Sequence, residues 1–342
     1  MYFQTPDTFK KFRCLADRCP DTCCAGWEVV IDPETEQTYQ NIRAPIGRRL
    51  RDAMTLDADG DCIFINRNCR CPFLDSQNLC EIHIALGEDA LSETCRLYPR
   101  FYNDYGALTE AGLSLSCPEA ARLILSDPVP MRFVTTQTDE PPEPDPDLDL
   151  HFVRRMFKAR RLGLALLQNR RFTIFERLAL LLQFATRLTA LLFAEDDSAE
   201  DALCRQFSDS GQLTQILSEL RIPDSPGGFE PFETLQAVFE LLSQCEHRQP
   251  GFTGQLARAQ KRMTQPGALA NIAFQSLHAH YYEHLSVYYL FRYFLDCVWS
   301  CEPLLQVQHT ALACLAAYAL SFDRFLHVCR KRWRLNYSNR LL

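Results

Sequence analysis

At 342 residues, the chain exceeds the length of one ordinary hydrophobic core, so its length predicts two domains. Its hydrophobic fraction of 47% is enough to bury a sizeable interior. The formal net charge is −7, with acidic residues in excess over the first 130 residues and a mild basic excess after residue 150. Nucleic-acid binders usually show a concentrated basic stripe, so this distribution argues against that class.

The N-terminal segment, residues 1–13, contains no apolar core of about 7–15 residues and no small-residue cleavage site. We therefore expect no secretory signal and a cytoplasmic protein. In a reducing compartment, clustered thiols bind metal more often than they form disulfides. The even number of cysteines leaves disulfides open if the chain is exported.

Cysteines are concentrated at the front of the chain, where ten of the 16 lie within the first 117 residues. The segment Arg13–Trp27 holds Cys14, Cys19, Cys23 and Cys24, and the later ones are Cys62, Cys69, Cys71, Cys80, Cys95 and Cys117. We interpret the remaining six as core packing, because a buried free cysteine behaves as a small hydrophobe. These are Cys204, Cys245, Cys297, Cys301, Cys314 and Cys329.

Two helix starts are predicted within the cysteine-rich part. Residues 14–27 are too polar for a periodic element and predict a loop, but Asp32 followed by Pro33 is typical of a capped helix start. Cys117-Pro118 predicts a second start. A cysteine there faces the positive end of the helix, which predicts a lowered pKa and a thiolate.

The segment 137–149 contains four prolines, six acidic residues and no aromatic residue, so it predicts an extended linker. It separates a loop-rich cysteine- and metal-binding domain, residues 1–136, from residues 150–342. In the latter, apolar residues recur at intervals of three and four, which predicts an α-helical bundle and a mainly α protein. Residues 303–322 lack charged side chains, but their glutamines and histidine favour a buried helix over a membrane span.

The cysteine spacing is compatible with more than one metal. Thiolates are the usual ligands of iron–sulfur clusters and of structural zinc. The first block reads C-x4-C-x3-C-C, and neither block contains the C-x2-C pair of a zinc ribbon. Separated zinc sites remain open.

Several cysteine-centred motifs resemble those of the flagellin lysine-N-methylase family, which is related to a broader group of cysteine-rich zinc- or iron-chelating proteins. They are Cys14, Cys19, Cys23-Cys24 with Gly26-Trp27, CPFL at 71–74, LCEI at 79–82, TCRLYPR at 94–100 and SCPE at 116–119. The resemblance implies a cytoplasmic enzyme that methylates surface lysines of flagellin with S-adenosylmethionine and depends on a 4Fe–4S cluster. From the charge distribution and the polarity of residues 303–322, we expect no nucleic-acid or membrane partner.

The resemblance also carries candidate site residues over to this chain. The preferred cluster ligands are Cys24, Cys71, Cys80 and Cys95, and Cys14, Cys19, Cys23 and Cys117 are a second site or alternates. The resemblance transfers only these cysteines; because they are near the cysteines in the sequence, we take Tyr98 and Tyr102 as candidate catalytic residues and Arg96, Arg100 and Tyr105 as candidates for binding S-adenosylmethionine. The chain has no G-x-G-x-x-G motif, which disfavours a Rossmann-type methyltransferase.

Two simpler interpretations remain beside these hypotheses, one for the whole protein and one for a pair of histidines. The protein can instead be a non-enzymatic zinc- or iron-binding protein with a helical partner-binding domain, in which the cysteines only fold the front domain. His280 and His284 share a helix face beside Glu283, but this is not the H-E-x-x-H motif, so packing is favoured over a metal pair.

Overall fold

The computed structural model describes residues 1–15, 18–23, 25, 29–65, 70–137, 139, 145–192, 197–220, 231–244, 251–263 and 272–321. Contacts divide these residues into two units. The helical unit combines Met1–Asp7 and Asp104–Glu110 with the chain from Ile124 onward, and the cysteine unit comprises Thr8–Asn103 and Ala111–Leu123. The division into domains 1–136 and 150–342 stays a prediction.

The cysteine unit is built from short elements. They are the 3-10 helices η1 (Phe9–Lys11) and η3 (Glu88–Ala90), the helices α1 (Pro33–Asn41), α2 (Pro45–Ala53), α3 (Glu81–Leu86) and α4 (Glu93–Leu97), and the strands β2 (Met54–Leu56) and β3 (Cys62–Phe64). The predicted start of α1 is confirmed, because the Asp32 carboxylate accepts a hydrogen bond of 2.9 Å from the Thr35 N–H.

The core of the cysteine unit is aromatic and aliphatic. Tyr39, Leu50, Phe64 and Phe73 are each at most 1% exposed. The rings of Phe64 and Phe73 lie 4.9 Å apart. The Tyr39 hydroxyl reaches the carbonyl of Ala90 at 2.7 Å, which joins α1 to η3. This core holds the loops that carry the cysteines.

A four-stranded sheet has the order β4-β5-β1-β6. Its strands are β1 (Tyr2–Pro6), β4 (Arg100–Asp104), β5 (Leu108–Leu113) and β6 (Phe133–Gln137). β1 runs parallel to β5, with Tyr2 opposite Leu108, and antiparallel to β6, with Tyr2 opposite Gln137. These strands were not predicted from the sequence, since each has only five or six residues and its partner in the sheet is set by tertiary structure.

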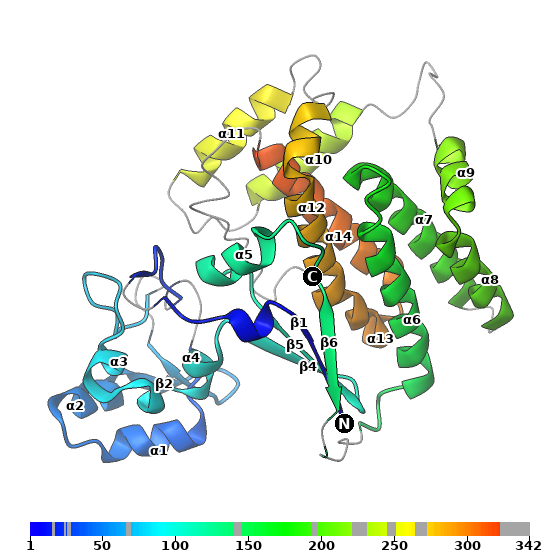
Figure 1. Cartoon of the computed structure of the whole chain (residues 1–342). Coiled ribbons are helices and arrows are strands. Elements are labelled where there is room, and N and C mark those ends of the chain that lie inside the picture. The colour runs from blue at the N-terminus through cyan, green and yellow to red at the C-terminus, as the bar shows by residue number, and fades with distance from the viewer. Residues whose placement is uncertain are drawn as a thin grey trace. The chain divides into compact units, whose positions relative to one another are not determined.

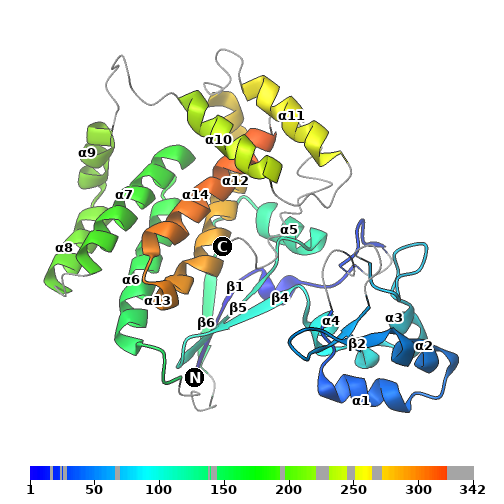
Figure 2. The same cartoon turned by 180° about the vertical axis from the view of Figure 1, so that it is seen from behind.

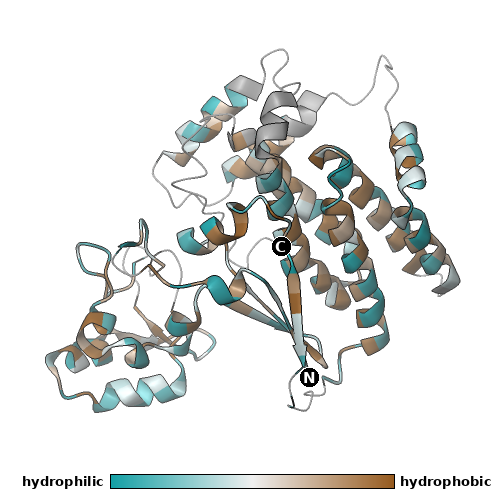
Figure 3. Ribbon diagram, in the orientation of Figure 1, coloured by the Kyte–Doolittle hydropathy of each residue, from teal (hydrophilic) through white to brown (hydrophobic). Residues whose placement is uncertain are grey.

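Beyond the sheet the chain is mainly helical, as predicted. The helices are α5 (Pro118–Leu125), α6 (Leu150–Leu167), α7 (Ile174–Leu192), α8 (Asp197–Ser208), α9 (Ser210–Leu220), α10 (Pro231–Gln244), α11 (Phe252–Met263), α12 (Ile272–Tyr293), α13 (Cys297–Ser300) and α14 (Pro303–Ser321), with the 3-10 helix η5 (Phe294–Asp296) before α13. α6, α7, α12 and α14 pack on one another, and Figures 1 and 2 show α6 beside α7. Figure 3 shows hydrophobic residues along most of α7, the helix that buries Leu178, Leu181 and Phe184.

Two buried carboxylates form ion pairs that cross-link the helical unit. The Glu110 carboxylate on β5 binds the Arg160 guanidinium on α6, and both side chains are at most 2% exposed. Arg160 also donates to the carbonyl of Phe291 on α12 at 3.0 Å. Arg170 and Arg177 bind Glu283 on α12 at 2.8 and 2.7 Å. Burial disfavours the Glu283 carboxylate, but the hydrogen bonds from both arginines outweigh burial and lower its pKa.

The His284 ring beside this pair is buried, and its Nδ1 lies 2.6 Å from the carbonyl oxygen of Ile124. The Glu283 carboxylate is therefore paired with arginines and His284 Nδ1 with a backbone carbonyl, while His284 Nε2 is buried without a hydrogen-bond partner among the described residues. His280, the other member of the sequence pair, stacks on Tyr281 with ring centroids 4.2 Å apart. These contacts agree with the packing interpretation.

The six scattered cysteines differ in burial. Cys297 and Cys314 are fully buried, as core packing requires, and Cys204 is partly buried. Cys301 is exposed, so the core-packing prediction is wrong there: it occupies the left-handed position that ends α13 and points into solvent. Cys245 and Cys329 lie outside the described residues.

Residues 303–321 form α14, with Val307, Ala313 and Cys314 buried, which confirms a helix at this place. Among the helices of the described chain, none combines the length and the apolar character that a membrane crossing requires. Of the predicted linker, Gln137 ends β6 and Asp149 caps α6 by accepting hydrogen bonds from the His151 and Phe152 N–H groups. Residues 138 and 140–144 lie outside the described part.

Candidate metal centre

A tight loop brings Cys71 and Cys80 to the same edge of the core. The N–H of Leu74 donates to the carbonyl of Cys71 at 3.2 Å, and Leu74 pairs with Cys80 in an isolated bridge. The Asp75 carboxylate accepts hydrogen bonds from two N–H groups within the loop, those of Gln77 and Leu79. The buried Phe73 ring anchors this loop, so its apolar and turn-forming residues place the two thiols.

Cys95 reaches the same core from α4. Ser92 caps this helix by accepting a hydrogen bond from the Cys95 N–H at 3.4 Å. Cys71, Cys80 and Cys95 all pack against the hydrophobic cluster that includes Phe64, Phe73 and Ile82. Three of the four preferred ligands, which are 24 residues apart at most, therefore pack against the same core.

The cysteines also affect one another's pKa values through electrostatic repulsion between their thiolates. Burial raises the pKa of Cys95 to about 12, and the charges of Cys71, Cys80 and Cys23 add to this increase. Burial likewise raises the pKa of Cys71 to about 11, with Cys80 and Cys23 again contributing. Cys23, which belongs to the first block of cysteines, therefore affects the pKa values of the later cysteines. A bound cation would reverse this effect, because positive charge stabilises thiolates.

Cys117 lies at the start of α5, as predicted, but its predicted low pKa is wrong. Burial raises the pKa of Cys117 to about 11, and this effect exceeds the lowering by the N–H groups of Ala120 and Glu119. The charges of Cys19 and Cys23 raise it further. Burial is a tertiary effect that a helix start in a sequence does not reveal.

Thiols from separate segments pack against one core, and thiolates are the ligands that iron–sulfur clusters and structural zinc use. Within the described chain, however, no three histidine, cysteine or acidic side chains lie within reach of a single metal ion. Cys24, a preferred ligand, lies outside the described residues, as does Cys69. Cys14 and Cys23 are exposed and Cys19 is partly buried. The ligand set stays a prediction.

The predicted catalytic residue Tyr98 connects two of the cysteine motifs. Its hydroxyl lies 2.8 Å from the Ser116 hydroxyl, which in turn lies 2.7 Å from the Ser114 hydroxyl. The Ser114 N–H donates to the carbonyl of Pro99 at 2.7 Å. Sequence reasoning missed Ser116 as a partner, although its place beside Cys117 in the SCPE motif was a usable signal.

Two of the other predicted residues, Arg100 and Tyr102, contact η1 and the residue that follows it. The Arg100 guanidinium lies 5.2 Å from the centroid of the Phe12 ring, close in sequence to Cys14. Tyr102 is 43% exposed and meets Phe9 edge-on, with ring centroids 6.5 Å apart. Arg96 is exposed in the last turn of α4.

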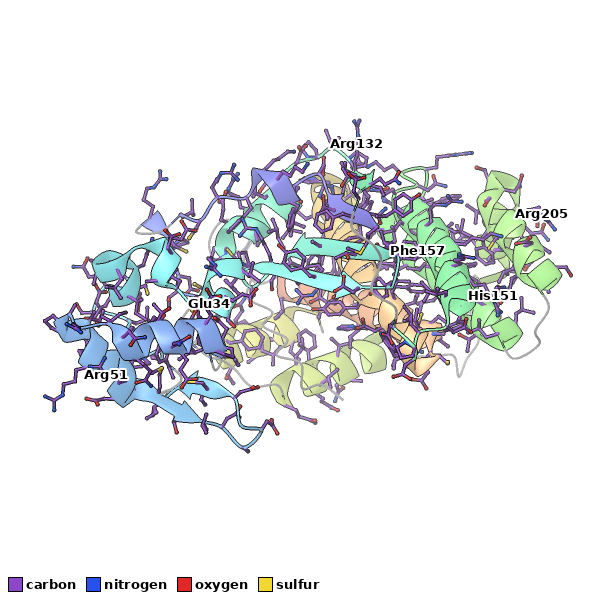
Figure 4. All side chains as sticks on the ribbon, turned by 90° about the horizontal axis from the view of Figure 1, so that it is seen from below. Glu34, Arg51, Arg132, His151, Phe157 and Arg205 are labelled. Carbon is purple, nitrogen blue, oxygen red and sulfur yellow. The ribbon has the colours of Figure 1, made fainter. Side chains whose placement is uncertain are left out.

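Tyr105 belongs to the helical unit. It is buried, and its ring meets that of Phe157 on α6, which Figure 4 labels, with centroids 6.4 Å apart. Its predicted role in binding S-adenosylmethionine stays a prediction, but its surroundings are those of a core residue.

Comparison with known proteins supplies the family. Residues 160–319 match the model of the FliB lysine N-methylase C-terminal domain. The chain is 32% identical over 130 residues to the flagellar biosynthetic protein FliU of Salmonella muenchen, a match that covers 34% of this chain and 73% of FliU. The chain belongs to the flagellin lysine-N-methylase family. The match to the C-terminal domain model begins within α6 at Arg160, the residue that ties α6 to β5 and α12.

Two relatives of this family are named lysine-N-methylase. That of Salmonella typhimurium strain LT2 is 31% identical over 136 residues, which is 36% of this chain and 32% of that protein. That of Salmonella choleraesuis strain SC-B67 is 32% identical over 130 residues, which is 34% of this chain and 31% of that protein. The match thus spans about a third of each lysine-N-methylase. No solved structure matches the chain.

Proposed function

We propose that this protein is a protein-lysine N-methyltransferase that transfers methyl groups from S-adenosylmethionine to surface lysines of flagellin in the cytoplasm. The observation that carries the proposal is membership of a family whose relatives are named lysine-N-methylase and flagellar biosynthetic protein. We further propose dependence on a 4Fe–4S cluster, which is supported by the free thiols gathered at the core of the cysteine unit.

Methyl transfer requires a neutral amine, because the nitrogen lone pair must form the new N–C bond while the C–S bond of the sulfonium breaks. Free lysine has a pKa of about 10.4, so the site must desolvate the ammonium or accept its proton. The amine must also lie in line with the methyl group, which is a problem of positioning. We assign the positioning of the amine to Tyr98, because a hydrogen bond with Ser116 fixes the Tyr98 hydroxyl.

S-adenosylmethionine, when bound, supplies the electrophilic methyl group. We assign its binding to the arginines of the CRLYPR motif, Arg96 and Arg100, whose guanidinium groups pair well with a carboxylate. Arg96 is exposed and so open to a ligand. Cys71, Cys80 and Cys95, with Cys24 as the fourth, would hold the cluster, which when bound supplies cationic iron to neutralise these thiolates.

The test is anaerobic purification followed by iron, zinc and sulfide analysis, and then incubation with flagellin and isotopically labelled S-adenosylmethionine. The proposal expects a brown protein with iron and sulfide, and label on flagellin lysines. A colourless protein with stoichiometric zinc and no transfer would instead support the non-enzymatic metal-binding alternative.

A further inference from the structure

β6 lies at the edge of the sheet that the described strands form. In the sheet order it lies beside β1 only, and no described strand pairs with its other side (Figure 1). Residues 134–137 are all exposed, and Val134 is 44% exposed. Natural edge strands are usually blunted by lysine, proline or a bulge, because an open edge pairs with other chains. The sequence FVTTQ contains no charge and no proline.

The register shows which backbone groups point outward. The Tyr2 N–H donates to the carbonyl of Ala107 on the β5 side, so the backbone of Phe3 and Thr5, which alternate with it, points to β6. Phe3 lies opposite Thr136, and Thr5 lies opposite Val134.

The Asp7 N–H donates to the carbonyl of Arg132, the residue before β6 that Figure 4 labels, which continues the same alternation. The N–H and C=O groups of Phe133, Thr135 and Gln137 therefore point away from the sheet. They form a row of donors and acceptors that an extended peptide can pair with.

The sequence that follows this strand is acidic. Asp139, two residues beyond Gln137, is exposed, and so are Asp145 and Asp147. Exposed carboxylates attract basic segments over a distance of about 8–10 Å at physiological salt. An occupant of the β6 edge that carries lysines would thus be favoured over a neutral or acidic one.

We propose that the outer edge of β6 docks an extended, lysine-bearing segment of the protein substrate as an added strand, with its lysines drawn to the acidic residues after Gln137. This proposal rests on the proposed function for the identity of the substrate. It assigns β6 to substrate capture, and the methyl transfer itself stays with the cysteine unit.

The test compares Thr135→Pro with Thr135→Val. Both variants lose the hydroxyl that accepts a hydrogen bond from the Gln4 amide at 2.8 Å, but only proline also lacks the outward N–H. Binding of fluorescently labelled flagellin monomers is measured by anisotropy, without S-adenosylmethionine. We expect the Kd of Thr135→Pro to be about five-fold or more above that of Thr135→Val, as for the loss of one or two backbone hydrogen bonds.

Equal Kd values, or no binding by either variant, would overturn the proposal. If Thr135→Pro does not fold by circular dichroism, the pair Gln137→Pro and Gln137→Ala provides the same comparison. Flagellin with acetylated lysines should bind more weakly, since acetylation removes the charge, and unchanged binding would overturn the assignment to lysines. The binding readout needs no catalysis, so a failure of methyl transfer with intact, proline-sensitive binding would count against the proposed function alone.

Discussion

The hydroxyl of Tyr98 lies 2.8 Å from the hydroxyl of Ser116, the residue that precedes Cys117. This contact joins the CRLYPR motif, which carries Cys95, to the SCPE motif, which carries Cys117. A side chain that connects two cysteine motifs is well placed to fix the position of a reacting group beside them. Tyr98 is therefore the first residue to test.

Tyr98→Phe removes one hydrogen bond and keeps the ring. We expect methyl transfer to flagellin to fall at least ten-fold, while the free energy of unfolding falls by only about 1 kcal/mol, the net contribution of a single hydrogen bond. Ser116→Ala should reproduce the effect in part, because it frees the same hydroxyl from its partner. If Tyr98→Phe methylates flagellin as fast as the parent protein, Tyr98 has no role in the reaction.

Cys95→Ser removes a thiol that packs against the same core as Cys71 and Cys80. Since serine is a poor ligand for iron, the anaerobically purified variant should lose most of its iron and sulfide. Cys301→Ser is the matched control, because Cys301 is exposed and lies in the helical unit. Elemental analysis of both variants decides the point, and equal iron content would remove Cys95 from the ligand set.

The buried pair of Glu110 and Arg160 predicts a large stability effect. Arg160→Met leaves the Glu110 carboxylate buried without its counter-charge, which costs about 3–5 kcal/mol in comparable cases. Urea unfolding should show this loss, and the double variant with Glu110→Gln should recover part of it. A single variant as stable as the parent protein would show that the pair does not hold β5 to α6.

The Glu283 carboxylate predicts a pH dependence of stability. Its pKa is lowered in the folded protein because the hydrogen bonds from Arg170 and Arg177 outweigh burial, so its contribution is fully present above the unfolded pKa of about 4.3. That contribution is lost as the pH falls through the folded pKa below this value. Glu283→Gln should therefore be less stable than the parent protein at pH 7, and the difference should shrink on acidification. A difference that does not depend on pH would contradict this account.

Local signals in the sequence predicted local structure well. The Asp32-Pro33 start of α1 and the helical character after Leu150 follow from capping and periodicity, which act within a few residues. The strands were missed because Tyr2 pairs with Leu108 and Gln137, more than 100 residues away. The raised pKa of Cys117 was missed for the same reason, since burial depends on the whole fold.

The candidate site was likewise predicted where it depends on local motifs and missed where it depends on the whole fold. The motif resemblance predicted which cysteines matter, and the structure packs Cys71, Cys80 and Cys95 against one core. It gave no indication of the Tyr98–Ser116 contact, which depends on how two motifs meet in space. Nearness in the sequence alone grouped Tyr105 with Tyr98, although Tyr105 is buried against Phe157 in the helical unit.

The most direct measurement is mass spectrometry of flagellin after incubation with S-adenosylmethionine and the anaerobically purified protein, with Cys95→Ser and Cys301→Ser in parallel. The account predicts methyl groups on flagellin lysines with the parent protein and Cys301→Ser, and none with Cys95→Ser. Unmodified flagellin from an iron- and sulfide-loaded parent protein, or full methylation by Cys95→Ser, would contradict it.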